Sequence, residues 1–266
     1  KSNKYWRLII HDSRRRMPIC CRQSQAIMSN DASPAKPFLK WAGGKRQLIE
    51  QIKQRLPANL NEFETYIEPF LGGGAVMFHL LQNRQFNRVI ALDLNPELIL
   101  CYNVVKNNVQ QLIDELKRIS DAYPPVNSPK KREAFFYDIR KKWNKEKPQF
   151  DTLSNEMKIK RVAKTIFLNK TCFNGLFRVN SKGEFNVPFG SYKKITILDE
   201  ENILKVAQLI QNVQFFNYDF SEALNFIEGL TFIYLDPPYR PLPNSPSFTS
   251  YTKSSFNDSK QKELAN

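Results

Sequence analysis

From Lys36 onward the chain alternates between short apolar runs and longer segments in which apolar residues recur every three or four positions. The apolar runs have the length and flanking turn residues of buried strands, and they occupy 65–67, 89–92, 213–216 and 231–235. The segments with helical spacing cover 48–56, 76–81, 98–119 and 221–227. We predict that the longest helix begins after Asn95, a favourable N-cap, with Pro96 at its first position.

This order of elements predicts an α/β protein with a doubly wound sheet. Its usual opening is a strand, a glycine-rich turn, a helix, a second strand that ends in an acidic residue, and a further helix. The alternation stops after the longest helix and resumes near residue 196. We therefore predict a sheet domain over 36–107 and 196–266, interrupted by a mainly helical domain over 108–195.

The two ends of the chain depart from this pattern. Residues 1–27 lack sustained periodicity and carry a run of three arginines, so we expect residues 1–35 to form a basic leader that is flexible or non-native. Met28 or Met17 is then the natural start. Asn266 lies inside a predicted helix over 258–266, and we expect the strands that complete such a sheet to lie beyond it, which would make this a truncated domain.

Charge separates the inserted region from the sheet. The chain has 40 Lys and Arg against 26 Asp and Glu, a net charge of +14. Residues 130–194 hold 17 basic and 6 acidic residues, and residues 1–22 hold 7 and 1, so the rest of the chain is slightly acidic. A basic surface suits a polyanion, and nucleic acid is the first candidate. The basic clusters at 130–132 and 140–142 form either a solvated helix face or a phosphate-binding surface.

Cysteine and histidine usage argues against a structural metal site. The four cysteines show no CxxC spacing, and the two histidines are far apart in the sequence. No apolar stretch is long enough for a membrane span, and the run at 8–10 is too short for a signal peptide. We therefore expect a cytoplasmic protein with no metal and no membrane partner.

Three consecutive glycines, Gly72 to Gly74, lie between the first strand and its helix. Glycines there let the backbone approach a ligand closely, although a lone glycine run is most simply an ordinary tight turn. It is not the G-x-G-x-x-G of dinucleotide-binding proteins. Asp93 ends the next strand, where a carboxylate either caps a turn or accepts hydrogen bonds from ribose hydroxyls. Together these features favour a cofactor that contains adenosine.

A second glycine pair lies in the segment 38–45. Trp41 offers a stacking surface, and Gly43 and Gly44 expose N–H groups beside a helix start, which suits a carboxylate or a phosphate. A helix N-terminus beside an incidentally buried tryptophan explains the segment equally well.

The most specific motif is Asp236-Pro237-Pro238-Tyr239, directly after the last strand. Ligands bind at the carboxyl ends of strands in open α/β sheets, and two prolines hold the chain rigid and extended. The carboxylate of Asp236 and a proline carbonyl can both accept hydrogen bonds from an exocyclic amino group, which aims the nitrogen lone pair at an electrophilic methyl group. Tyr239 can stack on the base, which must be flipped out of the duplex or unpaired. A proline-rich strand exit with a capping aspartate is the less favoured explanation.

These three motifs, in this order, resemble those of Dam-type adenine-N6 DNA methyltransferases of the alpha group, the D12 class, over residues 36–264. The resemblance implies a Rossmann-like S-adenosylmethionine-dependent methyltransferase sheet in which Asp236, Pro237, Pro238 and Tyr239 are catalytic. It places Asp93 on the ribose and Asp219 on the adenine amino group of the cofactor, and it implies that residues 248–251 help to close over the flipped base. The implied cofactor contacts are Lys40, Trp41, Ala42, Gly43, Lys45, Glu68, Pro69, Phe70, Gly72, Gly73, Gly74, Asp93, Asp219 and Phe220.

The inserted region resembles the target-reading β-hairpin of the same family at 173–178 and 183–190. Asn174-Gly175 is a turn signal, and Arg178 suits either a bidentate contact to a guanine edge or a phosphate contact. Phe173 suits either a wedge in the base stack or packing within the hairpin. Ser191 departs from the family pattern, which often has a basic residue there. The resemblance to GATC-reading members implies DNA contacts from Phe173, Asn174, Leu176, Arg178, Pro188 and Tyr192.

We therefore predict a site-specific methyltransferase that moves a methyl group from S-adenosylmethionine to adenine N6 in double-stranded DNA, within GATC, by base flipping and direct attack. We expect a monomer that acts alone or with a cognate restriction endonuclease as its genetic partner. Two alternatives stay open. One is a truncated or inactive DNA-binding fragment of such an enzyme, and the other is an amino methyltransferase acting on RNA, which more often carries Asn before the proline pair.

Overall fold

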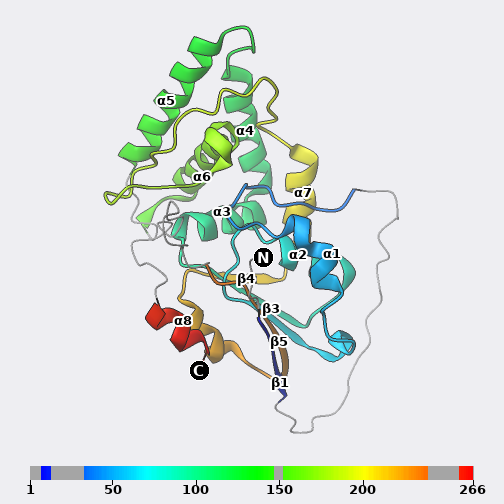
Figure 1. The fold of residues 1–266 in the computed structure, drawn as a ribbon. Coiled ribbons are helices and arrows are strands. Elements are labelled where there is room, and N and C mark those ends of the chain that lie inside the picture. The colour runs from blue at the N-terminus through cyan, green and yellow to red at the C-terminus, as the bar shows by residue number, and fades with distance from the viewer. Residues whose placement is uncertain (1–6, 13–32, 147–151, 239–257, 266) are drawn as a thin grey trace.

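A five-stranded sheet forms the base of the molecule (Figure 1). The computed structural model describes residues 7–12, 33–146, 152–238 and 258–265. The strands follow the order β1-β5-β2-β3-β4. Four of them are parallel to one another, namely β2 (Thr65–Glu68), β3 (Arg88–Leu92), β4 (Val213–Phe216) and β5 (Leu230–Leu235). The four predicted strands and the α/β class are thus confirmed.

The central strands are buried on both faces, which explains their continuous apolar runs. Successive side chains point to opposite faces. Tyr66 and Phe232 join the main core, while Ile67, Ile90 and Ile233 join a smaller apolar cluster on the other face. The helical elements around the sheet are α1 (Ile49–Lys53), α2 (Ala75–Asn83), α3 (Pro96–Asn107), α7 (Glu200–Leu209), α8 (Asp258–Ala265) and the 3-10 helices η1 (Arg46–Leu48), η2 (Leu60–Glu62) and η5 (Phe220–Phe226).

Strand β1 (Arg7–Asp12) lies in the leader, where the sequence predicted no regular element. It pairs antiparallel with β5 from Arg7 opposite Leu235 to Asp12 opposite Leu230. This segment becomes a strand because its backbone pairs with the edge of β5. Its residue pattern alone therefore does not predict a strand. Every helix in the described ranges is too short or too polar to cross a lipid bilayer.

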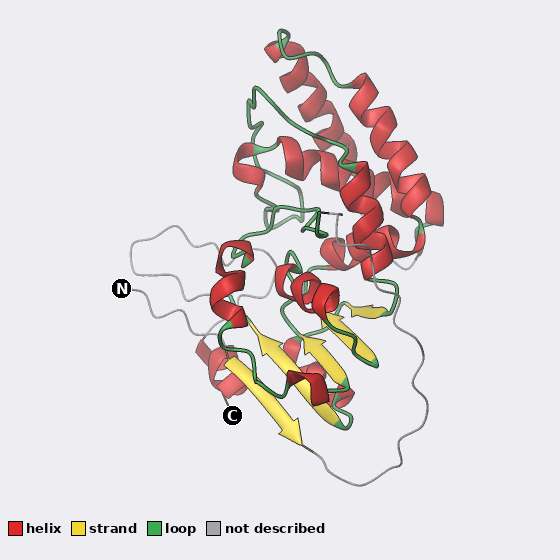
Figure 2. Ribbon diagram, turned by 90° about the vertical axis from the view of Figure 1, so that its right-hand side faces the viewer, coloured by secondary structure: helices red, strands yellow, loops and turns green. Residues whose placement is uncertain are grey.

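A layer of three long helices stands above the sheet (Figure 2). It consists of α4 (Val109–Ala122), α5 (Pro129–Lys145) and α6 (Asn155–Thr171). Helix α6 packs against α4, α5 and α3, and one apolar cluster runs from Tyr66 in the sheet to Phe136 and Trp143 in this layer. The division of the chain into separate domains stays a prediction.

The predicted long helix is two helices. Asn95 caps α3 as expected, accepting hydrogen bonds from the N–H groups of Glu97 and Leu98. The helix ends at Asn107, the φ of −137° at the following residue Asn108 is not helical, and α4 starts directly afterwards at Val109. Helix α3 is buried on nearly all sides between the sheet and α6, whereas α4 buries one stripe. The break was not predicted because the helical spacing of apolar residues continues from α3 into α4.

The predicted turn at Asn174-Gly175 is present, but the hairpin reverses later. Both residues have positive φ, 55° and 63°, and the N–H of Leu176 donates to the carbonyl of Phe173 at 3.3 Å. The chain reverses around 180–183, where the N–H groups of Lys182 and Glu184 donate to the Asn180 side chain. Isolated bridges pair Val179 with Phe185 and Cys172 with Phe189, in place of continuous strands.

Candidate active site

Three acidic residues lie at the carboxyl edge of the sheet. Glu68 ends β2, Asp93 follows β3 and Asp236 follows β5. Because β5, β2 and β3 are adjacent and parallel, these strands end at the same edge. This edge is where open α/β sheets bind ligands. The tertiary fold therefore brings together residues from three separate sequence motifs.

Lys45 forms an ion pair with Asp236. The two side chains are largely buried, with 6% of Lys45 and 14% of Asp236 exposed. The ammonium of Lys45 also donates to the carbonyl of Gly43 at 2.7 Å, which fixes it within its own loop. This ion pair attaches the loop 40–45 to the Asp-Pro-Pro motif. The two segments are far apart in the sequence, and the fold brings them into contact.

Glu68 lies next to this ion pair and is buried. Burial, reinforced by the negative charge of Asp236, raises its pKa to about 8, while a hydrogen bond from Tyr66 and the charge of Lys45 oppose the rise. The hydroxyl of Tyr66 donates to Oε2 of Glu68 at 2.6 Å. The raised pKa favours the protonated form of Glu68 at neutral pH, next to the ion pair of Lys45 and Asp236. Tyr66 was not predicted, although its position two residues before Glu68 on a strand puts both on one face.

The glycine turn 72–74 requires glycine at particular positions. Gly72 and Gly74 have φ of 49° and 67°, which disfavours any other residue. A methyl group on Gly74 would lie 2.6 Å from the hydroxyl of Tyr102, which donates to the carbonyl of Gly72 at 3.2 Å. Helix α2 begins immediately after this turn. Tyr102 of α3 thus packs on this turn and hydrogen-bonds to it.

Asp93 is half-buried beside the glycine turn. Its Oδ2 accepts from the N–H of Gly72 at 3.0 Å and its Oδ1 from the N–H of Asn95 at 2.9 Å. Burial raises the pKa of Asp93 to about 6, while these two hydrogen bonds lower it. A carboxylate has about four acceptor positions, so each oxygen keeps one for a further donor such as a ribose hydroxyl.

Trp41 connects the glycine turn to the inserted region. A methyl group on Gly72 would lie 3.2 Å from Cδ1 of Trp41, so the indole packs against the turn. The same ring stacks on Phe177 with centroids 5.2 Å apart. Part of the predicted stacking surface of Trp41 is therefore used within the protein.

Asp219 and Phe220 extend the site from the end of β4. Asp219 Oδ1 accepts from the N–H and the hydroxyl of Ser221, at 3.1 and 3.0 Å. Lys260 of α8 lies 3.4 Å from the same oxygen. The ring of Phe220 stacks on Phe70 at 5.4 Å, which joins this corner to the segment before the glycine turn.

The predicted DNA-reading residues lie on the segment between α6 and α7. Phe173 is 52% exposed, and Asn174, Arg178 and Pro188 are also exposed. Nε of Arg178 donates to Asn186 at 2.7 Å, which orients the guanidinium. The two halves of the segment meet where the N–H of Phe173 donates to the carbonyl of Pro188 at 2.9 Å. The remaining two predicted contacts, Leu176 and Tyr192, are half-buried.

The side chain of Lys40 lies on this segment. Its ammonium is 5.2 Å from the ring centroid of Tyr192, and its aliphatic chain packs against Gly175. Lys40 was predicted to contact the cofactor, but its side chain extends toward the segment that holds the predicted DNA contacts. The predicted residues Tyr239 and 248–251 lie outside the described residues.

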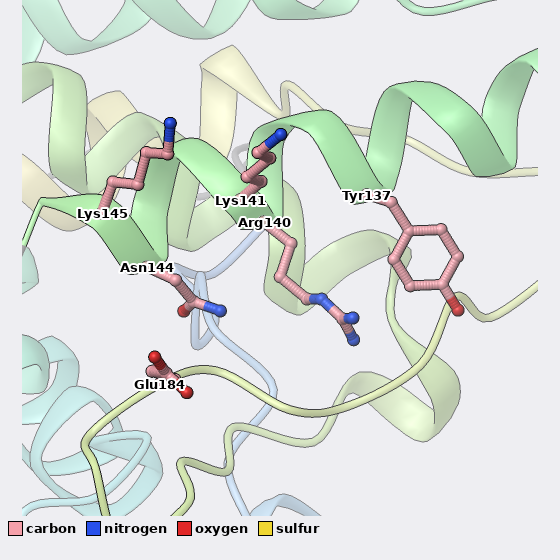
Figure 3. Close-up of a pocket in the computed structure, with 6 residues that line it drawn as sticks. All are labelled: Tyr137, Arg140, Lys141, Asn144, Lys145 and Glu184. Carbon is pink, nitrogen blue, oxygen red and sulfur yellow. The ribbon is translucent and has the colours of Figure 1, made fainter.

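A basic pocket of about 350 Å³ opens between α5 and the hairpin (Figure 3). Nη1 of Arg140 donates to the carbonyl of Val187 at 3.1 Å, and its guanidinium stacks on Tyr137. Arg140 and Lys141 of the 140–142 cluster therefore line a cavity, and no sequence signal had pointed to Asn144 or Glu184. Its lining residues are Tyr137, Arg140, Lys141, Asn144, Lys145 and Glu184. Within the described residues, no group of three His, Cys, Asp or Glu is placed to hold a metal ion.

Comparison with known proteins places this geometry in context. The profile of the D12 class N6 adenine-specific DNA methyltransferases matches residues 41–266. The type II methyltransferase M.MjaIII of Methanocaldococcus jannaschii is 50% identical over 232 residues, which are 86% of this chain and 78% of the relative. The DNA adenine methylases of Haemophilus influenzae and Escherichia coli K12 are 38% and 34% identical, over 86% of this chain and 73% and 74% of their own lengths.

Proposed function

Because this chain belongs to the D12 class N6 adenine-specific DNA methyltransferases, we propose that it methylates adenine N6 within GATC in duplex DNA with S-adenosylmethionine as the methyl donor. One observation carries this proposal. Asp236, at the carboxyl end of β5, lies beside Glu68 and the loop 40–45 at the edge of the sheet where Asp93 and the glycine turn also lie. The proposal thus assigns the target amino group and the adenosine of the donor to neighbouring positions on this edge.

The residues along this edge fit S-adenosylmethionine. Asp93 has acceptor positions for the ribose hydroxyls, and Asp219 has a carboxylate for the adenine amino group, flanked by the stacked rings of Phe70 and Phe220. Gly72 and Gly74 give the turn its positive φ values, and the N–H of Gly72 donates to the carboxylate of Asp93. When bound, the donor supplies a methyl group on a positively charged sulfur, which a nitrogen lone pair can attack.

Asp236 is the group that we assign to the target adenine. Its carboxylate and the carbonyl of Pro237 are acceptors for the two N–H groups of an exocyclic amine. The ammonium of Lys45 now donates to this carboxylate. A target adenine therefore replaces Lys45 as a donor, and the ion pair keeps the buried carboxylate compensated until the base arrives. Adenine inside a duplex cannot reach this recessed carboxylate, so we propose that the base is flipped out.

The proposed GATC specificity rests on the hairpin. Residues 173–178 and 183–190 resemble the target-reading hairpin of GATC-reading relatives, and Phe173, Asn174 and Arg178 are exposed. Arg178, already oriented by Asn186, suits a guanine edge in the major groove. Within this proposal the enzyme acts as a monomer, either alone or with a cognate restriction endonuclease as its genetic partner.

Methylation of a plasmid tests the proposal directly. The protein is incubated with plasmid and a donor labelled in the methyl group, and the plasmid is then digested with endonucleases that differ in sensitivity to GATC methylation. We expect label in adenine N6 and protection at GATC. Protection only at other sites would refute GATC and leave the chemistry intact, whereas failure to label adenine would refute the proposal.

The substitution Asp236→Ala tests the catalytic assignment. We expect turnover to fall by at least about 100-fold, the effect typical of losing one group aimed at the reacting centre. The matched control is Asp114→Ala on the exposed side of α4, which should turn over like the wild type. Near-normal turnover of Asp236→Ala would show that another residue binds the target amine.

A further inference from the structure

The side chain of Asn169, near the end of α6, is completely buried and bonds to two distant segments. Its Nδ2 donates to the carbonyls of Lys40, at 2.9 Å, and Gly175, at 3.0 Å. Its Oδ1 accepts from the N–H of Lys40 at 2.8 Å. Both amide protons and the oxygen are thus used on main-chain groups, which only an amide of this length can satisfy at once.

The two segments that Asn169 joins carry the two halves of the proposed reaction. Lys40 begins the loop whose Trp41 packs on the glycine turn and whose Lys45 pairs with Asp236. Gly175 belongs to the turn on which Phe173 and Asn174 are exposed to solvent, and these are two of the proposed DNA contacts. The main chains of the cofactor loop and the DNA-reading turn are therefore bonded to the same side chain.

Close packing makes this junction stiff. A methyl group on Gly175 would lie 2.9 Å from Cβ of Lys40 and would overlap its Cδ. Next to it, Trp41 stacks on Phe177, which follows the same turn. Buried close-packed groups transmit displacement because they have no free volume in which to relax. A displacement of the turn must therefore move the start of the loop.

We propose that Asn169 is a positioning residue that couples the DNA-reading turn to the cofactor loop, so that DNA and the methyl donor strengthen each other's binding. The inference rests on the proposed function, since it takes S-adenosylmethionine and DNA as the two ligands. The loop 40–45 is the element that both ligands bias, because it contacts the glycine turn at Trp41 and the target-amine acceptor at Lys45. Such coupling is reciprocal, so it can be measured from either ligand.

Binding measurements on the full chain test this coupling without turnover. The probe is S-adenosylhomocysteine, the unreactive product form of the donor, titrated by calorimetry with and without a short duplex that contains the site protected in the plasmid assay. In the wild type we expect the duplex to tighten the probe's Kd by about tenfold, within the usual range for coupled sites. In Asn169→Asp we expect the ratio of the probe's Kd without the duplex to its Kd with the duplex to fall to about one. The carboxylate still accepts from Lys40 but cannot donate to the two carbonyls.

Two further variants separate coupling from stability. Thr171→Val, on the same helix, removes a buried hydroxyl that donates only to the carbonyl of Phe167 within the helix, and it should keep the wild-type ratio. Gly175→Ala disturbs the other side of the junction and should lose the ratio as Asn169→Asp does. If thermal unfolding shows that Asn169→Asp does not fold, Gly175→Ala becomes the variant that tests the coupling.

The outcomes are distinguishable. A wild-type ratio in Asn169→Asp or Gly175→Ala, or no coupling in the wild type, would overturn the role of Asn169 and leave the proposed function standing. Failure of the wild type to bind the probe at all would instead count against the proposed function.

Discussion

Among single residues, Glu68 sets the protonation state of the candidate active site. Its carboxyl group is buried, accepts a hydrogen bond from Tyr66 and lies near Asp236, so its pKa rises from 4.5 to about 8. The folded protein therefore holds a proton at Glu68 that the unfolded chain releases above about pH 4.5. Stability from this group is fully present below pH 4.5 and is lost as the pH rises through 8.

Glu68→Gln tests this linkage, because glutamine resembles the protonated acid and does not titrate. We expect the free energy of unfolding of the wild type to fall between pH 5 and pH 9 by more than that of the variant. Urea unfolding at a series of pH values measures both. Glu133→Gln, at an exposed position on α5, should follow the wild type. A wild-type pH dependence in Glu68→Gln would show that Glu68 is ionised in the folded protein.

Among the elements, the contact of α3 with α6 depends on a buried ion pair. Nε of Arg161 donates to both oxygens of Glu97, at 2.8 and 3.0 Å. Its Nη1 donates to the carbonyls of Trp143, at 3.1 Å, and Glu146, at 2.6 Å, and its guanidinium lies 4.0 Å from the ring centroid of Trp143. Burial raises the pKa of Glu97 and Arg161 opposes that rise. One guanidinium thus joins the helix that follows Asp93 to both α5 and α6.

Glu97→Ala should destabilise the protein strongly, because it leaves Arg161 charged and buried. Removal of one partner of a buried pair costs about 3–5 kcal/mol. Urea unfolding at one pH gives this value. The comparison is Glu156→Ala, which removes an exposed pair with Lys160 within α6 and should have no measurable effect. Equal behaviour of the two variants would mean that water reaches the Arg161–Glu97 pair.

Across the whole molecule, charge and architecture coincide. The basic residues of 130–194 belong to the helical layer and its hairpin, above a sheet whose own charge is slightly acidic (Figure 1). Lys141 and Lys145 line the pocket between α5 and the hairpin. Because this pocket adjoins the predicted DNA contacts, we propose that these lysines bind phosphate rather than form only a solvated helix face.

The double substitution Lys141→Ala and Lys145→Ala should therefore weaken DNA binding equally for all sequences. The slope of log Kd against log salt concentration should fall by about two units, one for each phosphate contact. Fluorescence anisotropy across a range of salt concentrations measures the slope. Lys53→Ala, on α1 beside the sheet, is the matched control and should keep the wild-type slope (Figure 1). An unchanged slope in the double variant would place the phosphates elsewhere.

Much of the fold was predictable because its signals are local. The four parallel strands are apolar on both faces, so their short runs stand out, and Asn95-Pro96 marks the start of α3. The break at Asn108 was missed because apolar spacing continues across it, although the two helices pack against different elements. Strand β1 was missed because pairing with β5 defines it.

The sequence by itself determined the four parallel strands and the start of α3, the concentration of positive charge in the insertion, and the residue types at the ends of the strands. Each depends on neighbours within a few positions, where propensity, periodicity and turn chemistry act. Only the tertiary structure decided that Lys45 pairs with Asp236, that burial raises the pKa of Glu68, and that Asn169 joins Lys40, 129 positions away, to the turn at Gly175. Burial and long-range contact create these properties, and neither is present in an isolated segment of the chain.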